Sequence, residues 1–574
     1  MEAECSNADD GQLSTEDLPE EVLELISSEQ VFRMEAECSN SSGQLSIGDL
    51  PEEVLEFILS LLPPYGDLNN CMRVCRKWRR CVLNVAKTKQ RNFQKAINDF
   101  DIRWNLVTPQ DMSPPTITKR YSHTAVICDD SMYVFGGCTS AMTTFNDLWK
   151  LNLSTRTWGR PLAMGTYPSP KACSSLVHYK DYLVLFGGWT YPPTYPLYQG
   201  WHLFNELHIY DIKANRWTCV STIRTPPPVA GHSVSVVGEW MIIFGGLQKP
   251  STAVHCEKSN DIWKLHLETW TWYKQEVEDG PKPHGRFGQT QVILDDTNLL
   301  ILGGSGGPNS QFCDCWILNM VGNLWRWIKV DIVGKSNEPV NVWSNPGCKV
   351  GDKVVVLNRI RQNDENPIVY YPRSQWNLTS EDSRLSRIDL ANRRPDVDEN
   401  VNGRRGNLRN SKREAEEHDE SVPGPSFVAN NIPEIRVSQF VPQSVPMAAF
   451  QSSQIGMHQR NLLRERRIQT LQSIKLKLKK NSLQTSKNEK PRRLGIYVLD
   501  LSEVLSKNPR ATWLPPNNLN NGTGETILYT LMKGRSELIM FGGILKDANF
   551  SSTSNLNHQI SNSLHFITAP NYVI

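Results

Sequence analysis

The chain has 574 residues, of which 39% are hydrophobic and 21% are charged, and its formal net charge is +2. This composition is typical of globular structure with some disorder, and the small net charge argues against a general affinity for nucleic acid or membranes. The sequence has no run of about 18 apolar residues and no N-terminal signal core, so we expect a cytoplasmic or nuclear protein without a membrane partner. In that reducing setting, the 13 cysteines are expected to be free thiols.

The head of the chain carries a duplication. Residues 1–7 recur letter for letter as residues 34–40, and residues 17–24 recur as 49–56. The first copy stops before a second helix could follow, so it is only half of the module described next. We therefore expect residues 1–45 to be disordered and to hold no second binding site.

A small all-helical module is predicted over residues 46–86. Pro51 suits a first helical turn, and Glu52 and Glu53 complement the positive end of the helix dipole. Apolar residues then recur every three or four positions, from Val54 to Leu62, as in an amphipathic helix. A second helix is expected to carry Cys71, Val74, Cys75 and Trp78, followed by a helical linker over residues 87–103.

The Leu-Pro pair at 50–51 and the Val-Cys-x-x-Trp pattern at 74–78 resemble the F-box, a helical module of about 40 residues. The alternative is an ordinary helical hairpin. The resemblance implies docking on the Skp-type adaptor of cullin-based ubiquitin ligases. The residues that it assigns to the adaptor surface are Leu50, Pro51, Val54, Leu55, Ile58, Leu59, Val74, Cys75 and Trp78.

Beyond the helices, apolar runs that end in Gly-Gly recur at 135–137, 186–188, 244–246, 302–304 and 541–543. A tryptophan follows the first four runs: Trp158, Trp217, Trp272 and Trp327. A repeat of about 50 residues with several short strands is typical of the Kelch β-propeller. We therefore predict a mainly β protein built from such blades.

Reading the strands one by one predicts six blades. The first blade has strands at 122–127, 131–135 and 148–153 and a fourth around Trp158. The fifth is degenerate: its first two strands are expected within 350–357, and its last two, at 496–500 and Trp513, follow a long insertion. The sixth has strands at 526–531, 538–541 and 563–567 but no fourth. We expect Trp104 to supply that strand and so close the ring.

The propeller thus occupies residues 104–360 and 494–574, with an insertion at 361–493 that is polar and is expected to be disordered. Within it, Leu463, Leu471, Ile474 and Leu478 fall at helical spacing among lysines and arginines. This segment is compatible with a basic amphipathic helix, a nuclear-import signal, a nucleic-acid patch or a solvated basic stretch. We do not expect nucleic acid as a partner.

Catalytic chemistry is not indicated. The cysteines at 71, 75 and 81, and those at 313 and 315, lack the spacing of a zinc site and are expected to be core thiols. His123 and His232 occupy matching positions in two blades, but Ser174 takes that place in a third, so no metal set converges. We expect a non-enzymatic protein without cofactor or metal.

One face of the propeller is expected to bind a protein substrate, because the loops after the Gly pairs and the links between blades emerge there together. The loop at 189–204 is the richest in aromatic residues: Trp189, Tyr191, Tyr195, Tyr198, Trp201 and Phe204. They form a candidate hot spot, although the loop could instead fold onto its own blade. Arg120, Lys171 and Arg286 begin the opening strands on this face and could attract an acidic or phosphorylated segment.

An F-box directly before Kelch repeats, with a late blade split by a long insertion, resembles the F-box only protein 42 family. The resemblance implies a substrate receptor of an SCF ubiquitin ligase, bound through a Skp-type adaptor to cullin and RING subunits. The alternatives are a Kelch scaffold or cytoskeletal-binding protein without a ligase role and, from another class, a copper oxidase.

Overall fold

The computed structural model describes residues 47, 50–107, 114–139, 143–191, 202–222, 224–249, 256–307, 310–344, 346–360, 493–516, 522–546 and 559–570. The predicted disordered head at 1–45 lies outside these residues, and so do residues 361–492 of the predicted insertion with their basic segment.

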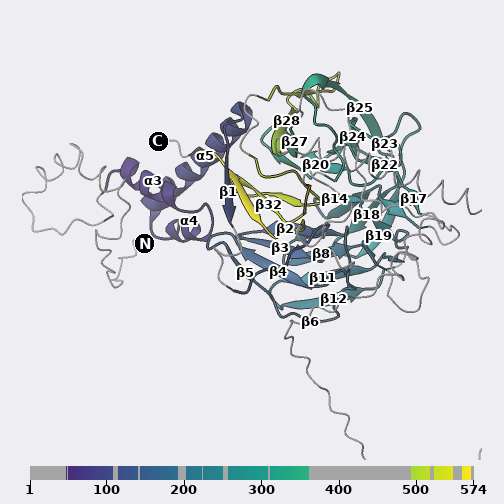
Figure 1. Ribbon diagram of the computed structural model, residues 1–574, viewed down its shortest axis with the longest axis horizontal. Coiled ribbons are helices and arrows are strands. Elements are labelled where there is room, and N and C mark those ends of the chain that lie inside the picture. The colour runs from purple at the N-terminus through teal and green to yellow at the C-terminus, as the bar shows by residue number, and fades with distance from the viewer. Residues whose placement is uncertain are drawn as a thin grey trace, which may run out of the picture. The chain divides into compact units, whose positions relative to one another are not determined.

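Within the described residues, three helices precede the strands (Figure 1): α3 (Glu52–Leu61), α4 (Gly66–Cys71) and α5 (Arg76–Asp99). The prediction of a single second helix is wrong, because the extended backbone of Cys75 (φ −159°, ψ 176°) separates α4 from α5. Cys71 ends α4, Val74 and Cys75 lie in the link, and Trp78 belongs to α5. Helix α5 continues through residues 87–99, so the module and the expected linker share one helix. Among the described helices, none is long and apolar enough to span a membrane.

The strands form a six-bladed β-propeller, as predicted. Each blade has four antiparallel strands, called a to d here, and the a strands of neighbouring blades contact one another (Figure 1). Blades 1 to 3 comprise β2 (Thr124–Cys128), β3 (Ser131–Phe135), β4 (Leu148–Asn152) and β5 (Thr157–Gly159); β7 (Ser175–Tyr179), β8 (Tyr182–Phe186), β11 (Leu207–Asp211) and β12 (Arg216–Val220); and β14 (Ser233–Val237), β15 (Trp240–Phe244), β18 (Ile262–His266) and β19 (Thr271–Gln275).

Blades 4 to 6 follow the same plan. They comprise β20 (Thr290–Asp295), β21 (Asn298–Leu302), β24 (Cys315–Asn319) and β25 (Arg326–Val333); β26 (Gly347–Val350), β27 (Lys353–Arg359), β28 (Leu494–Asp500) and β29 (Arg510–Trp513); and β31 (Thr530–Lys533), β32 (Glu537–Phe541), β34 (Leu564–Thr568) and β1 (Arg103–Val107). Blade 5 begins earlier than expected, since β26 ends at Val350 rather than starting there. It is split between β27 and β28, where the insertion was predicted.

Strand β1 closes blade 6, as predicted from Trp104. It pairs with β34 over its whole length, and Trp104 lies opposite Ile567. This is the register found in the other blades, where Trp158 faces Leu151 and Trp217 faces Tyr210. The N-terminal strand therefore removes the exposed edge that blade 6 would otherwise present.

A hydrophobic cluster fills the seam between each pair of neighbouring blades. At most seams, the aromatic residue before a Gly pair meets the d-strand tryptophan of the next blade. The ring centroids are 5.6 Å apart for Phe135–Trp217, 4.6 Å for Phe186–Trp272, 5.1 Å for Phe244–Trp327 and 5.0 Å for Phe541–Trp158. The repeat of Phe-Gly-Gly and Trp is thus the signature of one contact made again at successive seams.

The Gly pairs connect blades through the backbone. Gly136 and Gly137 have φ values of +67° and +96°, which favour glycine. The Gly137 amide donates to the carbonyl of Lys171 in blade 2 at 3.0 Å, and a Cβ on Gly136 would lie 2.4 Å from that oxygen. Glycine is required here both by the left-handed backbone and by the close approach of the next blade.

Candidate adaptor and substrate surfaces

Helix α3 presents two apolar stripes. Leu55 and Leu59 are buried in a core with Leu68, Val82 and Val85 from the other helices, and Trp78 packs partly against it. The prediction that Leu55 and Leu59 form adaptor contacts is therefore wrong, because the helical module uses them for its own core.

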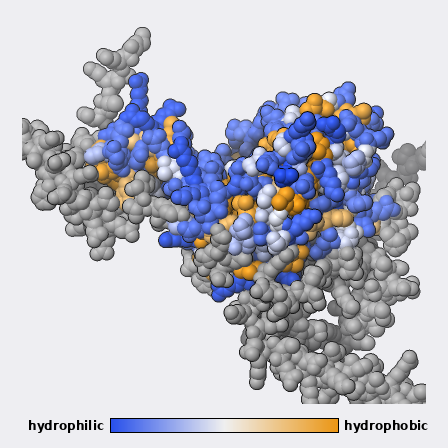
Figure 2. All heavy atoms as spheres, turned by 90° about the horizontal axis from the view of Figure 1, so that it is seen from above, coloured by the Kyte–Doolittle hydropathy of each residue, from blue (hydrophilic) through white to orange (hydrophobic). Residues whose placement is uncertain are grey.

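The second stripe of α3 is open to solvent. Pro51 is exposed, Val54 and Ile58 are half-buried, and Leu61 is 44% exposed. These positions follow a helical spacing of three and four residues, so they share one face. Leu50 is half-buried beside this stripe in sequence, while Val74 is 61% exposed in the link before α5. Cys75 is exposed as well, contrary to the expected core thiol. Figure 2 shows hydrophobic side chains on the helical part of the chain, at the left.

Polar contacts join α3 to α5. Lys77 Nζ donates to the Leu50 carbonyl at 2.7 Å, and Asn84 Nδ2 donates to Glu56 Oε1 at 2.9 Å. Arg80 pairs with Glu52, and its hydrogen bond and charge lower the pKa of that exposed carboxyl. These contacts hold the start of α3 against α5, which positions the open stripe.

The helical module is also bonded to the propeller. Tyr65, which is buried, donates its hydroxyl to Glu537 Oε1 at 2.6 Å, and the Gly66 amide donates to Ser154 Oγ at 2.9 Å. Arg535 bridges Asn69 and Asp130 at 3.0 and 2.9 Å. Burial raises the pKa of Glu537 despite the opposing Tyr65 hydrogen bond. All of these propeller residues lie at or beside a–b or c–d turns.

The loops after the Gly pairs lie at the opposite ends of the strands. In blades 1, 2 and 4, the residue that leads into strand a bridges to the segment after the Gly pair: Tyr121 to Cys138, Ala172 to Trp189, and Phe287 to Ser305. Blades 3 and 6 make the same contact with short strands: β13 (Val229–Ala230) with β16 (Leu247–Gln248), and β30 (Thr526–Ile527) with β33 (Ile544–Leu545). Both loop classes therefore share one face, which we call the Gly-pair face, and the helices contact the other.

A hydrophobic cluster, the mouth cluster, spans several blades on the Gly-pair face. Its buried members are Tyr121, Cys138, Ala172, Trp189, Leu203, Ala230, Leu528 and Ile560, with Cys173, Tyr191, Cys256, Ile527 and Ile544 partly exposed. Trp189 is thus core rather than a free anchor, and its ring lies 4.9 Å from that of Tyr191. The Tyr191 hydroxyl lies 3.2 Å from that of Tyr121. The candidates Tyr195, Tyr198 and Trp201 lie outside the described residues.

The expectation that Arg120, Lys171 and Arg286 present positive charge to a substrate is wrong. All three are fully buried and paired at 2.6–2.8 Å with Asp147, Glu206 and Asp314, respectively. Each also lies 4.3–4.4 Å from the ring of Phe145, Phe204 or Phe312. Burial alone would raise the pKa of Asp147, but the hydrogen bonds and charge of Arg120 outweigh it and lower that pKa. These pairs hold each loop against its blade.

The sequence did hold a signal for these pairs. Asp147, Glu206 and Asp314 occupy the same repeat position, directly before strand c, in the blades that have a basic residue before strand a. Blade 3 has Val229 at the basic position, and its acidic residue, Asp261, pairs with Lys274 instead. The acidic and basic positions are both filled only in blades 1, 2 and 4, and there the two side chains form a buried pair.

The matched histidines also have structural partners. His123 Nε2 lies 2.9 Å from Thr530 Oγ1 of blade 6, and His232 Nε2 lies 2.9 Å from Ser175 Oγ of blade 2. Burial lowers the pKa of His123 to about 3 and that of His232 to about 4, so both are neutral at pH 7. Over the described ranges, no group of three His, Cys, Asp or Glu side chains is arranged to hold a metal ion.

Comparison with known proteins identifies both parts. Residues 47–87 match the family model F-box-like. The helical module is an F-box. Residues 120–327 match the family model described as FBX42, beta-propeller domain, which confirms the resemblance inferred from an F-box placed directly before Kelch repeats.

Several curated relatives are Kelch domain-containing proteins. Kelch domain-containing protein 1 of Mus musculus is 30% identical over 220 residues, which is 34% of this chain and 52% of that protein. Kelch domain-containing protein 3 of Bos taurus is 26% identical over 274 residues, or 45% of this chain and 67% of that protein. The chain thus spans about half the length of the first relative.

Proposed function

We propose that this chain is the substrate receptor of an SCF-type ubiquitin ligase, with the F-box on a Skp-type adaptor and the Gly-pair face on a protein substrate. The observation that carries the proposal is the second stripe of α3. Pro51, Val54, Ile58 and Leu61 lie exposed or half-buried on a short helix whose adjacent apolar stripe already fills a core. An apolar stripe that a protein leaves open is typical of a partner surface.

The proposed adaptor surface comprises Leu50, Pro51, Val54, Ile58, Leu61 and Val74, with Cys75 at its edge. The stripe is matched in chemistry to a hydrophobic groove, and Glu52 and Arg80 beside it supply a polar rim. Through the adaptor, the cullin and RING subunits would bring a ubiquitin-charged enzyme to the complex.

In this role the chain makes and breaks no bond itself. It supplies proximity, because a substrate held on the Gly-pair face shares one complex with the ubiquitin-charged enzyme, and their encounter becomes intramolecular. The F-box contacts the a–b and c–d turns, at the far ends of the strands from the Gly-pair face. Adaptor and substrate would therefore not compete for the same surface.

The adaptor arm is tested with the full chain and a purified Skp-type adaptor. The double variant Val54→Glu/Ile58→Glu is expected to lower the affinity at least about 100-fold, since it places two charges in a buried apolar interface. Leu162→Glu is the matched control, because Leu162 is 80% exposed on the propeller. Binding that is absent in the wild type, or equal in the double variant, would contradict the proposal and favour a Kelch scaffold.

The substrate arm is tested by proximity labelling in cells. Because Trp189 and Leu203 belong to the mouth cluster, only residues 192–201 should be replaced, by a Gly/Ser segment of equal length. Proteins labelled by the wild type and lost with the replacement are candidate substrates. An unchanged set of labelled proteins would count against recognition by this loop.

A further inference from the structure

One seam of the propeller, between blades 5 and 6, is built differently from the others. In blade 5, Asn358 and Arg359 stand where the other blades described here end strand b with a Gly pair. The Arg359 amide donates to Asn358 Oδ1 of its own strand at 2.8 Å, whereas Gly543 donates across its seam to Arg120 O at 2.9 Å. Side chains bridge this seam instead. Tyr529 Oη donates to Leu357 O at 2.8 Å, and Cys348 Sγ to Leu531 O at 3.3 Å.

A second set of backbone hydrogen bonds, which runs from blade to blade, is also interrupted at this seam. One residue in each blade, just before strand a, has a left-handed backbone: Ser122, Cys173, Gly231, Gly288, Ser344 and Leu528, with φ from +50° to +66°. From Ser122 to Ser344, the amide of each residue donates to the carbonyl of the matching residue in the preceding blade at 2.8–3.0 Å. The series begins with Ser344, which donates to Gly288, and ends with Ser122, which donates to Leu528. Within the described residues, no such bond joins Leu528 to Ser344. The ring of hydrogen bonds therefore opens between blades 5 and 6.

The core of this seam is completed by the F-box helix. The d-strand tryptophans of the other five blades, such as Trp217 and Trp513, are buried, but Trp104 of blade 6 is only half-buried. Helix α5 fills the space with Phe93, Ile97 and its C-cap, Phe100, which are 1–4% exposed.

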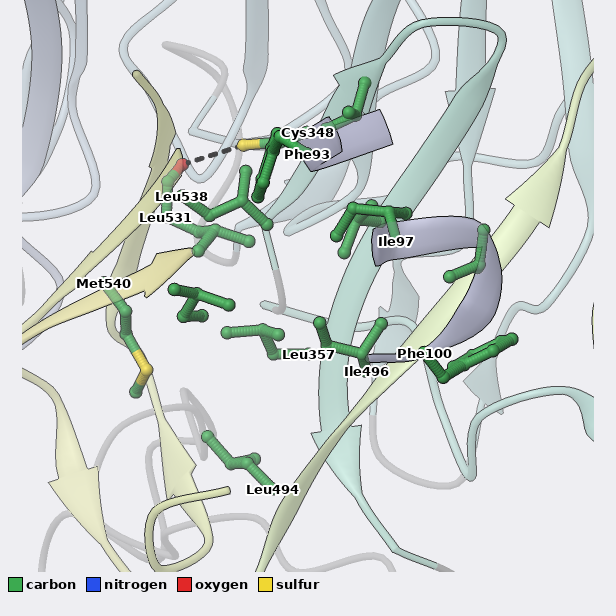
Figure 3. Close-up of a cluster of buried hydrophobic side chains, with 14 of the residues drawn as sticks. Phe93, Ile97, Phe100, Cys348, Leu357, Leu494, Ile496, Leu531, Leu538 and Met540 are labelled. Carbon is green, nitrogen blue, oxygen red and sulfur yellow. Dashed lines mark hydrogen bonds between the residues drawn. The ribbon is translucent and has the colours of Figure 1, made fainter. Parts of the chain in front are cut away.

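Figure 3 shows these three side chains among residues from both blades. Ile496 and Leu357 belong to blade 5, and Leu538 belongs to blade 6. The C-terminal half of α5 therefore packs against both sides of the seam at once.

We propose that α5 is the closing element of the propeller, and that adaptor binding at the F-box stabilises the seam between blades 5 and 6. The N-terminal half of α5 supplies Cys81, Val82 and Val85 to the F-box core, and its C-terminal half fills the seam. A single helix thus belongs to two cores. The F-box and the propeller form one cooperative unit, and the seam opens when α5 is released.

The coupling follows from thermodynamic linkage. A partner that binds only the folded F-box disfavours release of α5, and so disfavours opening of the seam that α5 holds. The same linkage makes a closed seam favour adaptor binding. This second step depends on the proposed function, whereas the closing role of α5 depends only on its packing.

Hydrogen exchange on the full chain, read by mass spectrometry, separates the two steps. Phe93→Leu and Ile97→Ala are expected to speed exchange in β27, β28 and β31 at least about 30-fold, as for the loss of buried core packing, and to leave β14 and β15 unchanged. Lys95→Ala is the matched control, since Lys95 is exposed on the same helical turn. Unchanged exchange at the seam, or an equal rise in every blade, would overturn the closing role. Should Ile97→Ala not fold, Ile97→Val gives the same comparison with a smaller expected rise.

The second step is measured on the wild type with and without a purified Skp-type adaptor. Slower exchange in α3 together with β27, β28 and β31 supports the coupling. Protection of α3 without any change at the seam would overturn the coupling and leave the proposed function standing. No protection of α3 at saturating adaptor would contradict the proposed function and the coupling together, while the variants still decide the closing role.

Discussion

The buried pair of Arg120 and Asp147 gives the sharpest stability prediction, because sequence and structure assign Arg120 different roles. Its side chain is fully buried and donates to both carboxylate oxygens of Asp147, at 2.7 and 2.9 Å, and to Gly136 O at 2.9 Å. The Asp147 side chain is only 11% exposed. Replacing Arg120 with Met would leave a buried carboxylate without its cation, so we expect the free energy of unfolding to fall by about 3–5 kcal/mol.

The control is the exposed pair of Lys213 and Asp181, with side chains 75% and 52% exposed. Lys213→Met should cost less than about 1 kcal/mol, because water screens that pair. Urea unfolding at pH 7, followed by tryptophan fluorescence, compares the two. Arg120→Met/Asp147→Asn should recover part of the loss, since no buried charge is then left uncompensated.

The pair also predicts a pH dependence. Because Arg120 lowers the pKa of Asp147 below its ordinary value of 3.8, the stabilisation is present above that value and is lost as the pH falls below it. A cost for Arg120→Met as small as that for Lys213→Met would refute the structural role. Unchanged stability together with loss of substrate labelling would indicate instead that Arg120 belongs to the substrate surface.

Three further predictions concern the blades. Gly136→Ala should lower the free energy of unfolding in urea by at least about 3 kcal/mol, because the new Cβ would lie 2.4 Å from Lys171 O. Gly238 is also at positive φ but has open space around it, so Gly238→Ala should cost about 1–2 kcal/mol. Equal costs would contradict the close approach. Trp104→Ala should lower the free energy of unfolding by about 2 kcal/mol, which is less than the loss expected for replacing a fully buried tryptophan. Deletion of residues 101–108 should lower the melting temperature markedly, and an unchanged melt would refute closure by β1. The pKa of His232 is lowered to about 4 from 6.5, so the stabilisation by its neutral side chain is present above pH 6.5 and is lost as the pH falls toward 4. Between pH 6.5 and 5, the free energy of unfolding of the wild type should therefore fall by about 2 kcal/mol more than that of His232→Gln. Identical pH profiles for the two proteins would refute this.

The repeat allowed most of the fold to be predicted from the sequence. Strand β3 matches its predicted range of 131–135, and the register of Trp104 opposite Ile567 confirms the closure of blade 6. Such predictions succeed because one local pattern is read several times and every copy constrains the others. Blade 5 was placed less well at its first strand, since Asn358 and Arg359 replace the Gly pair that marks the end of strand b elsewhere.

The surfaces were harder to predict than the strands. A helical period separates an apolar face from a polar one, but α3 has two adjacent apolar stripes, and only packing shows that Leu55 and Leu59 face inward while Val54 and Ile58 do not. Likewise, a basic residue at a strand start does not by itself reveal its partner, which becomes visible only when the acidic residue before strand c of the same blade is considered with it. Arg120 finds Asp147 across 27 positions of the sequence, a pairing that the fold creates.

The central claim is that one chain links a substrate on the Gly-pair face to a ubiquitin ligase on the F-box. It is tested most directly by measuring ubiquitin on proteins that the chain binds through residues 192–201, in cells expressing wild type, Val54→Glu/Ile58→Glu or the Leu162→Glu control. The proposal predicts that these proteins remain bound to the F-box double variant but lose ubiquitin and accumulate, while the control behaves as the wild type. Ubiquitination that is equal in all three would contradict it.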